Sequence, residues 1–275
     1  MSRRFYGDIG FGRRDLIKAL GAAGVGFAFT TACSGAKDDT TAATDSPSPA
    51  VAEIAASPDP AIENRPSAAD MTPDEALQLL TDGNKRFVEG TLMHPRGSKS
   101  RIIDTAVDQF PFAAFLSCAD SRVPVEEIFD QGIGDCFVCR VAGNIATTQE
   151  TGSLEFGTLV LGSKVLLVIG HERCGAVAAS MGRIALPANP GSIPSLVPLI
   201  EPAVKSIQEK VAKEGVAAVL NDLDATIKLN VHNQVANLRK SPILSQLEKD
   251  SKLKIVPAYY DLDKGTVVIL DAPTA

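Results

Sequence analysis

Two continuous apolar runs constrain the fold of this chain more than any other feature. FAAFLS (Phe112–Ser117) and KVLLVI (Lys164–Ile169) do not alternate between polar and apolar residues, which is typical of central strands in a parallel sheet. A third such run, Cys136–Val141, lies between them, and helical patterns separate the three. Strands that alternate with helices predict an α/β fold, a mostly parallel central sheet with helices on both faces.

Helix and hairpin signals complete this outline. Thr72–Glu75 reads TPDE, in which threonine is a helix N-cap, proline suits the first turn and glutamate completes a capping box, so we expect a helix to about Glu89. Further helices are expected over 125–129, 152–161, 174–181, 195–213, 216–239 and 241–250. Leu253–Tyr260 and Thr266–Leu270 flank a turn and predict a hairpin, which would add a C-terminal antiparallel edge strand.

Polar groups follow two of the predicted strands. CADSRVP (Cys118–Pro124) comes directly after the first strand, and GHERCG (Gly170–Gly175) comes after the third. Sites in parallel sheets form at the carboxyl ends of strands. Cys118, His171 and Cys174 therefore make a candidate Cys2His set, which suits a catalytic zinc site with one position left for water.

Asp120 is either a fourth metal ligand or a group beside the metal. Arg122 is two residues further on, where a bidentate contact would orient the carboxylate. The alternative is a surface ion pair next to two core cysteines. Cys136 and Cys139 lie three residues apart on a strand, so their side chains point to opposite faces and we interpret both as buried apolar thiols.

The N-terminal quarter of the chain, residues 1–67, differs in character from the rest. Arg13 and Arg14 precede a Gly/Ala-rich apolar run, which resembles a twin-arginine export signal over residues 1–33. A short membrane anchor or a buried helix is the alternative. Cys33 ends the run after small residues and is a candidate for lipidation, with ordinary cleavage or an uncleaved tail as alternatives.

Residues 34–67 are rich in Ala, Thr, Ser and Pro, which predicts a flexible linker before a folded domain over 68–275. We thus expect an exported protein, periplasmic or tethered to the outer side of the cytoplasmic membrane. The net charge of −6 and the lack of a basic stripe argue against nucleic-acid binding, and five cysteines are a poor disulfide framework.

Taken together, the motifs resemble the β-class carbonic anhydrases over about residues 70–275. The matching stretches are CADSRVP, RVAGN (140–144), GSLEF (152–156), HERCGAV (171–177), 230–244 and 252–265. The resemblance implies that Cys118, His171 and Cys174 hold Zn²⁺. It implies reversible hydration of CO2 to bicarbonate and a proton, by attack of zinc-bound hydroxide. Asp120 and Arg122 would be the catalytic dyad, with Asp120 a fourth ligand in an inactive form.

The resemblance also assigns a substrate pocket and an assembly. Gln109 would hydrogen-bond substrate, and Phe137 and Phe156 would line the CO2 pocket. The family implies a homodimer or higher even oligomer, with active sites near the subunit interface. Arg173 departs from the pattern, because aspartate is usual there.

Three alternatives remain at this point. One is a related zinc hydrolase on the same fold that acts on carbonyl sulfide or carbon disulfide. The second is a non-catalytic zinc-stabilised binding module. The third is a redox protein that uses Cys136 and Cys139.

Overall fold

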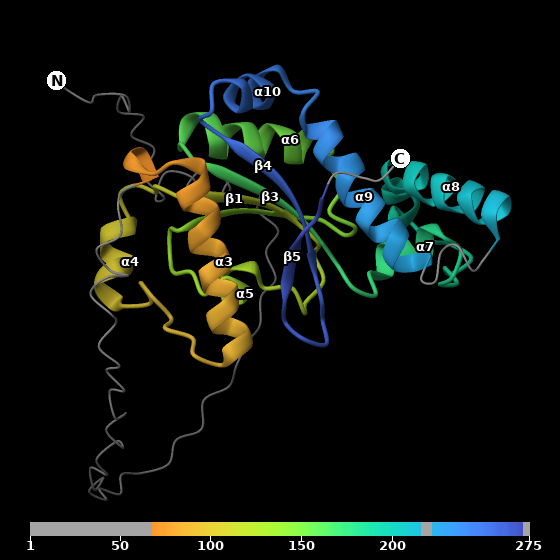
Figure 1. Ribbon diagram of the computed structural model, residues 1–275, viewed down its shortest axis with the longest axis horizontal. Helices are drawn as coiled ribbons and strands as arrows, with labels where there is room; N and C mark the ends of the chain where they lie inside the picture. The colour runs from red at the N-terminus through yellow and green to blue at the C-terminus, as the bar shows by residue number, and fades with distance from the viewer. Residues whose placement is uncertain (1–67, 216–221, 272–275) are drawn as a thin grey trace, which may run out of the picture. The chain divides into compact units, whose positions relative to one another are not determined.

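The computed structural model describes residues 68–215 and 222–271, all within the unit Ala55–Ala275 (Figure 1). The predicted export signal, the linker and Cys33 lie outside the described residues, as does the predicted start of a helix at residue 216. Among the residues described, no helix is long and apolar enough to cross a membrane.

A five-stranded sheet with the order β2-β1-β3-β4-β5 forms the centre of the domain. The strands are β1 Ala113–Ser117, β2 Cys136–Arg140, β3 Val165–His171, β4 Lys254–Tyr260 and β5 Val267–Ile269. The first four are parallel, and β5 pairs antiparallel with β4. The predicted fold class is confirmed, including the C-terminal antiparallel edge strand.

Helices cover both faces of the sheet (Figure 1). They are α3 Pro73–Glu89, α4 Lys99–Thr105, α5 Val125–Ile128, α6 Thr148–Glu155, α7 Gly175–Ser180, α8 Val197–Glu214, α9 Asp222–Leu238 and α10 Pro242–Lys249, with short 3-10 helices at Ala68–Asp70 and Ile193–Leu196. Helices α3 and α5 pack on one face, whereas α6, α9 and α10 pack on the other.

The two central strands explain why the sequence shows continuous apolar runs. Every residue of β1 and β3 is buried, and successive residues contribute to opposite cores: Phe115 faces α3, and Leu116 faces α9. A fully buried side chain of this size contributes about 1.5–3 kcal/mol. A two-sided core of this kind holds the carboxyl ends of β1 and β3 in a fixed relation.

Helix α3 begins as predicted. The Thr72 hydroxyl accepts from the Glu75 amide, and the Glu75 carboxylate accepts from the Thr72 amide, so both halves of the capping box form. Gly90 ends the helix at φ 69°, a left-handed conformation that suits glycine.

Three local features differ from the sequence-based expectations. Helix α4 was not predicted, because none of its residues is buried and the helix therefore adds no apolar face to the core. The helix predicted over 152–161 begins earlier, at Thr148, and ends as a π-helix over Phe156–Val160.

The interpretation of Cys136 and Cys139 as buried thiols is wrong. Both are only half-buried, because β2 is an edge strand of the sheet. Their placement on opposite faces is correct, since Cys136 packs against the α3 core and Cys139 against the α9 core.

Candidate metal centre

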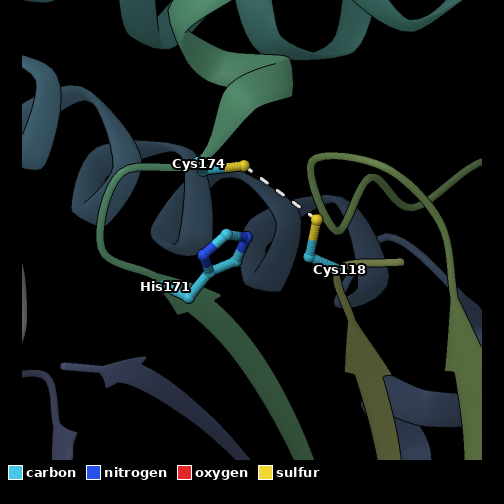
Figure 2. Close-up of side chains that lie close together, drawn as sticks. All are labelled: Cys118, His171 and Cys174. Atoms are coloured by element: carbon cyan, nitrogen blue, oxygen red, sulfur yellow. Dashed lines mark hydrogen bonds between the residues drawn. The ribbon is translucent and has the colours of Figure 1, made fainter. Parts of the chain in front are cut away.

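Cys118, His171 and Cys174 come together at the carboxyl edge of the sheet (Figure 2). Cys118 directly follows β1, His171 ends β3 and Cys174 is the N-cap residue of α7. The strands are parallel neighbours, with Ser117 paired to Ile169, so their ends lie side by side. One ligand atom from each residue lies within 4.8 Å of the others, which confirms the predicted juxtaposition.

The packing of α9 against β3 brings the histidine to this point. A Cβ added at Gly170 would lie 2.6 Å from Cγ2 of Val231 and 3.1 Å from Cγ2 of Ile227, so only glycine allows the helix to approach so closely. His171 follows immediately and is fully buried.

The geometry of the donor set fits a tetrahedral zinc ion. Two sulfurs bound to one zinc at about 2.3 Å would lie about 3.8 Å apart, and the sulfurs of Cys118 and Cys174 are 4.0 Å apart. Nδ1 of His171 lies 2.9 Å from the Glu172 carbonyl oxygen. A proton on Nδ1 leaves the lone pair on Nε2, which is the usual arrangement for a metal-binding imidazole.

Nε2 of His171 is the strongest sign of a missing partner. It is buried and has no hydrogen-bond partner, a costly situation for a polar atom. Figure 2 shows the imidazole edge directed toward the space between the two sulfurs. A cation shared with Cys118 and Cys174 would satisfy this nitrogen.

The two thiols differ in acidity. The hydrogen bond between the two sulfurs is the largest influence on Cys118 and lowers the pKa of its thiol, with smaller contributions from His171 and the Gly143 amide. The same hydrogen bond, together with burial, raises the pKa of Cys174. A thiolate buried at this point needs a compensating charge, which a divalent cation would supply.

Asp120 and Arg122 form a bidentate pair beside this cluster. Nε and Nη2 of Arg122 donate to Oδ1 and Oδ2 of Asp120 at 2.9 and 2.8 Å, and the Arg122 amide donates to Oδ1 at 3.0 Å. The Arg122 side chain is the main reason that the pKa of Asp120 is lowered. Oδ2 lies 3.7 Å from Nε2 of His171, so an ionised carboxylate sits next to the three donors.

Arg140 is a structural residue of the site to which the sequence analysis gave no role. It ends β2, and its guanidinium donates to the backbone oxygens of Cys118 (3.0 Å) and Asp120 (2.5 Å). It therefore fixes the loop that carries both residues. The RVAGN match was the available signal, but only the register of β2 against β1 shows what Arg140 contacts.

Arg173, the departure from the family pattern, points to the β4–β5 turn. It has a left-handed backbone (φ 54°), and its guanidinium donates to both carboxylate oxygens of Asp263 at 3.0 and 2.6 Å. The loop between His171 and Cys174 is thereby tied to that turn.

The three predicted substrate residues are not brought to this cluster within one chain. Gln109 is exposed and precedes β1, at the amino end of the sheet. Phe137 pairs with Ala114, four residues before Cys118, which corresponds to about 13 Å along the strand. Phe156 lies beside Phe137, with ring centroids 6.3 Å apart, and its side chain is part-exposed.

Comparison with known proteins identifies the family. The carbonic anhydrase family model matches residues 113–267, from the start of β1 to β5. The chain belongs to the carbonic anhydrase family. The matched range includes every member of the Cys118, His171 and Cys174 cluster, and also Asp120 and Arg122. The prediction of an enzyme that interconverts CO2 and bicarbonate is confirmed at this level.

Similar carbonic anhydrases have been found in several organisms. Carbonic anhydrase 2 of Mycobacterium tuberculosis is 37% identical over 203 residues, 72% of this chain and 93% of the relative. The carbonic anhydrase of Mycolicibacterium smegmatis is 35% identical over 199 residues, 71% of this chain and 92% of the relative. Among solved structures, a tetrameric β-carbonic anhydrase of Sordaria macrospora shares the fold at a TM-score of 0.54 and 24% identity, covering 63% of this chain and 87% of that one.

Proposed function

We propose that this carbonic anhydrase is a zinc enzyme in which Cys118, His171 and Cys174 hold the ion. The observation that carries the proposal is the buried Nε2 of His171, which has no hydrogen-bond partner and belongs to a cluster with two sulfurs 4.0 Å apart. Three protein ligands leave one position of a tetrahedral site for water, as in catalytic zinc sites.

The residues around the site have distinct roles in this proposal. Zinc bound there would supply Lewis-acid activation of a water molecule for attack on CO2. Asp120 would accept a hydrogen bond from the attacking water and orient it toward the carbon atom. Arg122 keeps Asp120 ionised and fixes its direction through two parallel hydrogen bonds. Arg140 holds the loop so that Cys118 and Asp120 keep their spacing.

Metal analysis and stopped-flow CO2 hydration of the purified full-length chain test the zinc proposal. We expect one zinc per chain and activity that is lost with a chelator and restored by Zn²⁺. His171→Ala removes the partnerless nitrogen and should abolish both metal content and activity. An active His171→Ala protein without zinc would refute the assignment.

We further propose that the active form is a homodimer or higher even oligomer. Phe156, Leu159 and Val160 leave 47%, 53% and 63% of their surface exposed in the single chain. Large apolar side chains grouped in this way are typical of a protein interface. A second copy of the chain is also the simplest source of Gln109, Phe137 and Phe156 at the site. One chain places these three residues away from its own cluster of Cys118, His171 and Cys174. The similar enzymes of Sordaria macrospora are tetrameric.

Export is proposed on the basis of the sequence alone. Arg13 and Arg14 precede an apolar run that ends at Cys33, as expected of a twin-arginine signal with a lipidation site. Cell fractionation tests this directly: replacement of both arginines by lysine should retain the protein in the cytoplasm. Cys33→Ala should release an exported protein from the membrane fraction, and mass spectrometry of the N-terminus would identify an acyl group.

A further inference from the structure

Helix α9 contains two fully buried amide side chains that are not explained by packing alone. Asn230 and Gln234 are one helical turn apart, and Nε2 of Gln234 donates to Oδ1 of Asn230 at 2.9 Å. Nε2 of Gln234 also donates to the Leu199 carbonyl. Buried amides are costly unless their hydrogen bonds are made, so a pair of this kind indicates a specific task.

Both amides bind the loop that follows β2. Nδ2 of Asn230 donates to the Gly143 carbonyl at 3.0 Å, and Oε1 of Gln234 accepts from the Ala146 amide at 2.9 Å. The loop is thereby held at two points, three residues apart, by one helix. The contacts span about ninety residues of sequence.

The loop held in this way directs one backbone N–H group toward the sulfur of a proposed metal ligand. The Gly143 amide donates to Sγ of Cys118 at 3.3 Å, inside the buried cluster. Gly143 has φ +78°, and a Cβ there would lie 2.7 Å from Cδ1 of Ile200 and 3.3 Å from Cβ of Ala176. No side chain fits at this position, so the N–H orientation depends on glycine and on the amides that hold its carbonyl.

We propose that Asn230 and Gln234 are positioning residues of the metal centre, which act by directing the Gly143 N–H at the Cys118 sulfur. The inference rests on the proposed zinc site. A hydrogen bond to a thiolate withdraws charge from the sulfur, so the sulfur donates less to the metal and the metal remains a stronger Lewis acid. Two thiolates donate more negative charge to a metal than neutral histidines do. A hydrogen bond that reduces this donation therefore has a larger effect here than it would in an all-histidine site.

Three variants separate this role from simple support of the fold. Asn230→Leu keeps the branched shape of the side chain and removes the donor to Gly143. Gln234→Met keeps the Asn230 contact with Gly143 and removes the Ala146 contact. Thr226→Val is the matched control, because Thr226 is also fully buried on α9 but its hydroxyl bonds only to the Asp222 carbonyl of its own helix.

The readout is the thiolate-to-metal absorption of the full-length protein loaded with Co²⁺. Loss of the N–H···S bond raises the energy of the sulfur electrons, so the band should move to longer wavelength in Asn230→Leu and less far in Gln234→Met. Thr226→Val should lower the melting temperature without moving the band.

The outcomes distinguish the two proposals. A wild-type protein that fails to bind one metal ion per chain would refute the zinc site itself. A wild type that binds metal normally, with the same Co²⁺ spectrum in Asn230→Leu, Gln234→Met and Thr226→Val, would overturn the positioning role and leave the zinc site intact. If Asn230→Leu does not fold, the Gln234→Met spectrum decides the question.

Discussion

Asp120→Asn removes one charge beside the Cys118, His171 and Cys174 cluster and keeps the shape of the side chain. Asp120 accepts three N–H groups, all from Arg122. Asparagine has a single acceptor oxygen, so at least one charge-assisted hydrogen bond is lost and an NH2 group faces a guanidinium. The pair is partly exposed, with side-chain exposures of 49% for Arg122 and 18% for Asp120, so the cost in stability is only about 0.5–1 kcal/mol.

The effect on catalysis should be much larger than the effect on stability. Loss of a positioned hydrogen-bond acceptor typically costs about 10²–10⁴-fold in rate, equivalent to roughly 2.7–5.4 kcal/mol of barrier. We therefore expect kcat/KM for CO2 hydration to fall by at least about 100-fold, with zinc content unchanged. For a domain of this size, the melting temperature should fall by no more than about 2–4 °C.

The chain offers a closely matched control in Glu248→Gln. Glu248 accepts two N–H groups of Arg239 at 2.8 and 2.9 Å and the Ile255 amide at 3.2 Å, with side-chain exposures of 49% for Arg239 and 21% for Glu248. Glu248→Gln should therefore cost similar stability and no activity. Equal stopped-flow rates for Asp120→Asn and wild type, both fully loaded with zinc, would refute the role of Asp120.

The stability that the Asp120–Arg122 pair contributes should depend on pH in a defined direction. The pKa of Asp120 is lowered in the folded state, chiefly by Arg122, so the contribution to stability is complete above about pH 5 and is lost as the pH falls toward the folded-state pKa. The difference in stability between wild type and Asp120→Asn should be constant near neutral pH and shrink in acid. Urea unfolding at several pH values measures this difference, and a difference that grows in acid would contradict the assignment.

Three further predictions concern the ligand set, the core and the assembly. Cys174→Ser should lower zinc affinity by more than about 100-fold in chelator competition, since a hydroxyl is a far poorer zinc ligand than a thiolate; unchanged affinity would exclude Cys174 from the site. Leu167→Ala should lower the free energy of unfolding in urea by about 2–5 kcal/mol, because Leu167 is fully buried in β3; a loss below about 1 kcal/mol would contradict that packing. Phe156→Asp should lower the molar mass measured by light scattering, because it places a charge in the proposed interface. Val268→Asp, at an exposed position on edge strand β5, should leave the molar mass unchanged.

The strands and the first helix were readable from the sequence because their signals are local. Continuous burial of β1 and β3 requires apolar residues at every position, and the capping box of α3 spans only Thr72–Glu75. Cys118 and His171 were placed correctly for the same reason. Each directly follows or ends an apolar run, and parallel strands bring such ends together.

The contacts that complete the site depend on residues far apart in the chain. The hydrogen bonds of Arg140 with the Cys118 loop, and of Asn230 with Gly143, follow from strand register and from the approach of α9, which no local pattern specifies. The exposure of Cys136 and Cys139 depends on β2 being an edge strand. By itself, the sequence determined which groups end each strand; the tertiary structure decided which neighbours hold them, because packing between distant segments sets those distances.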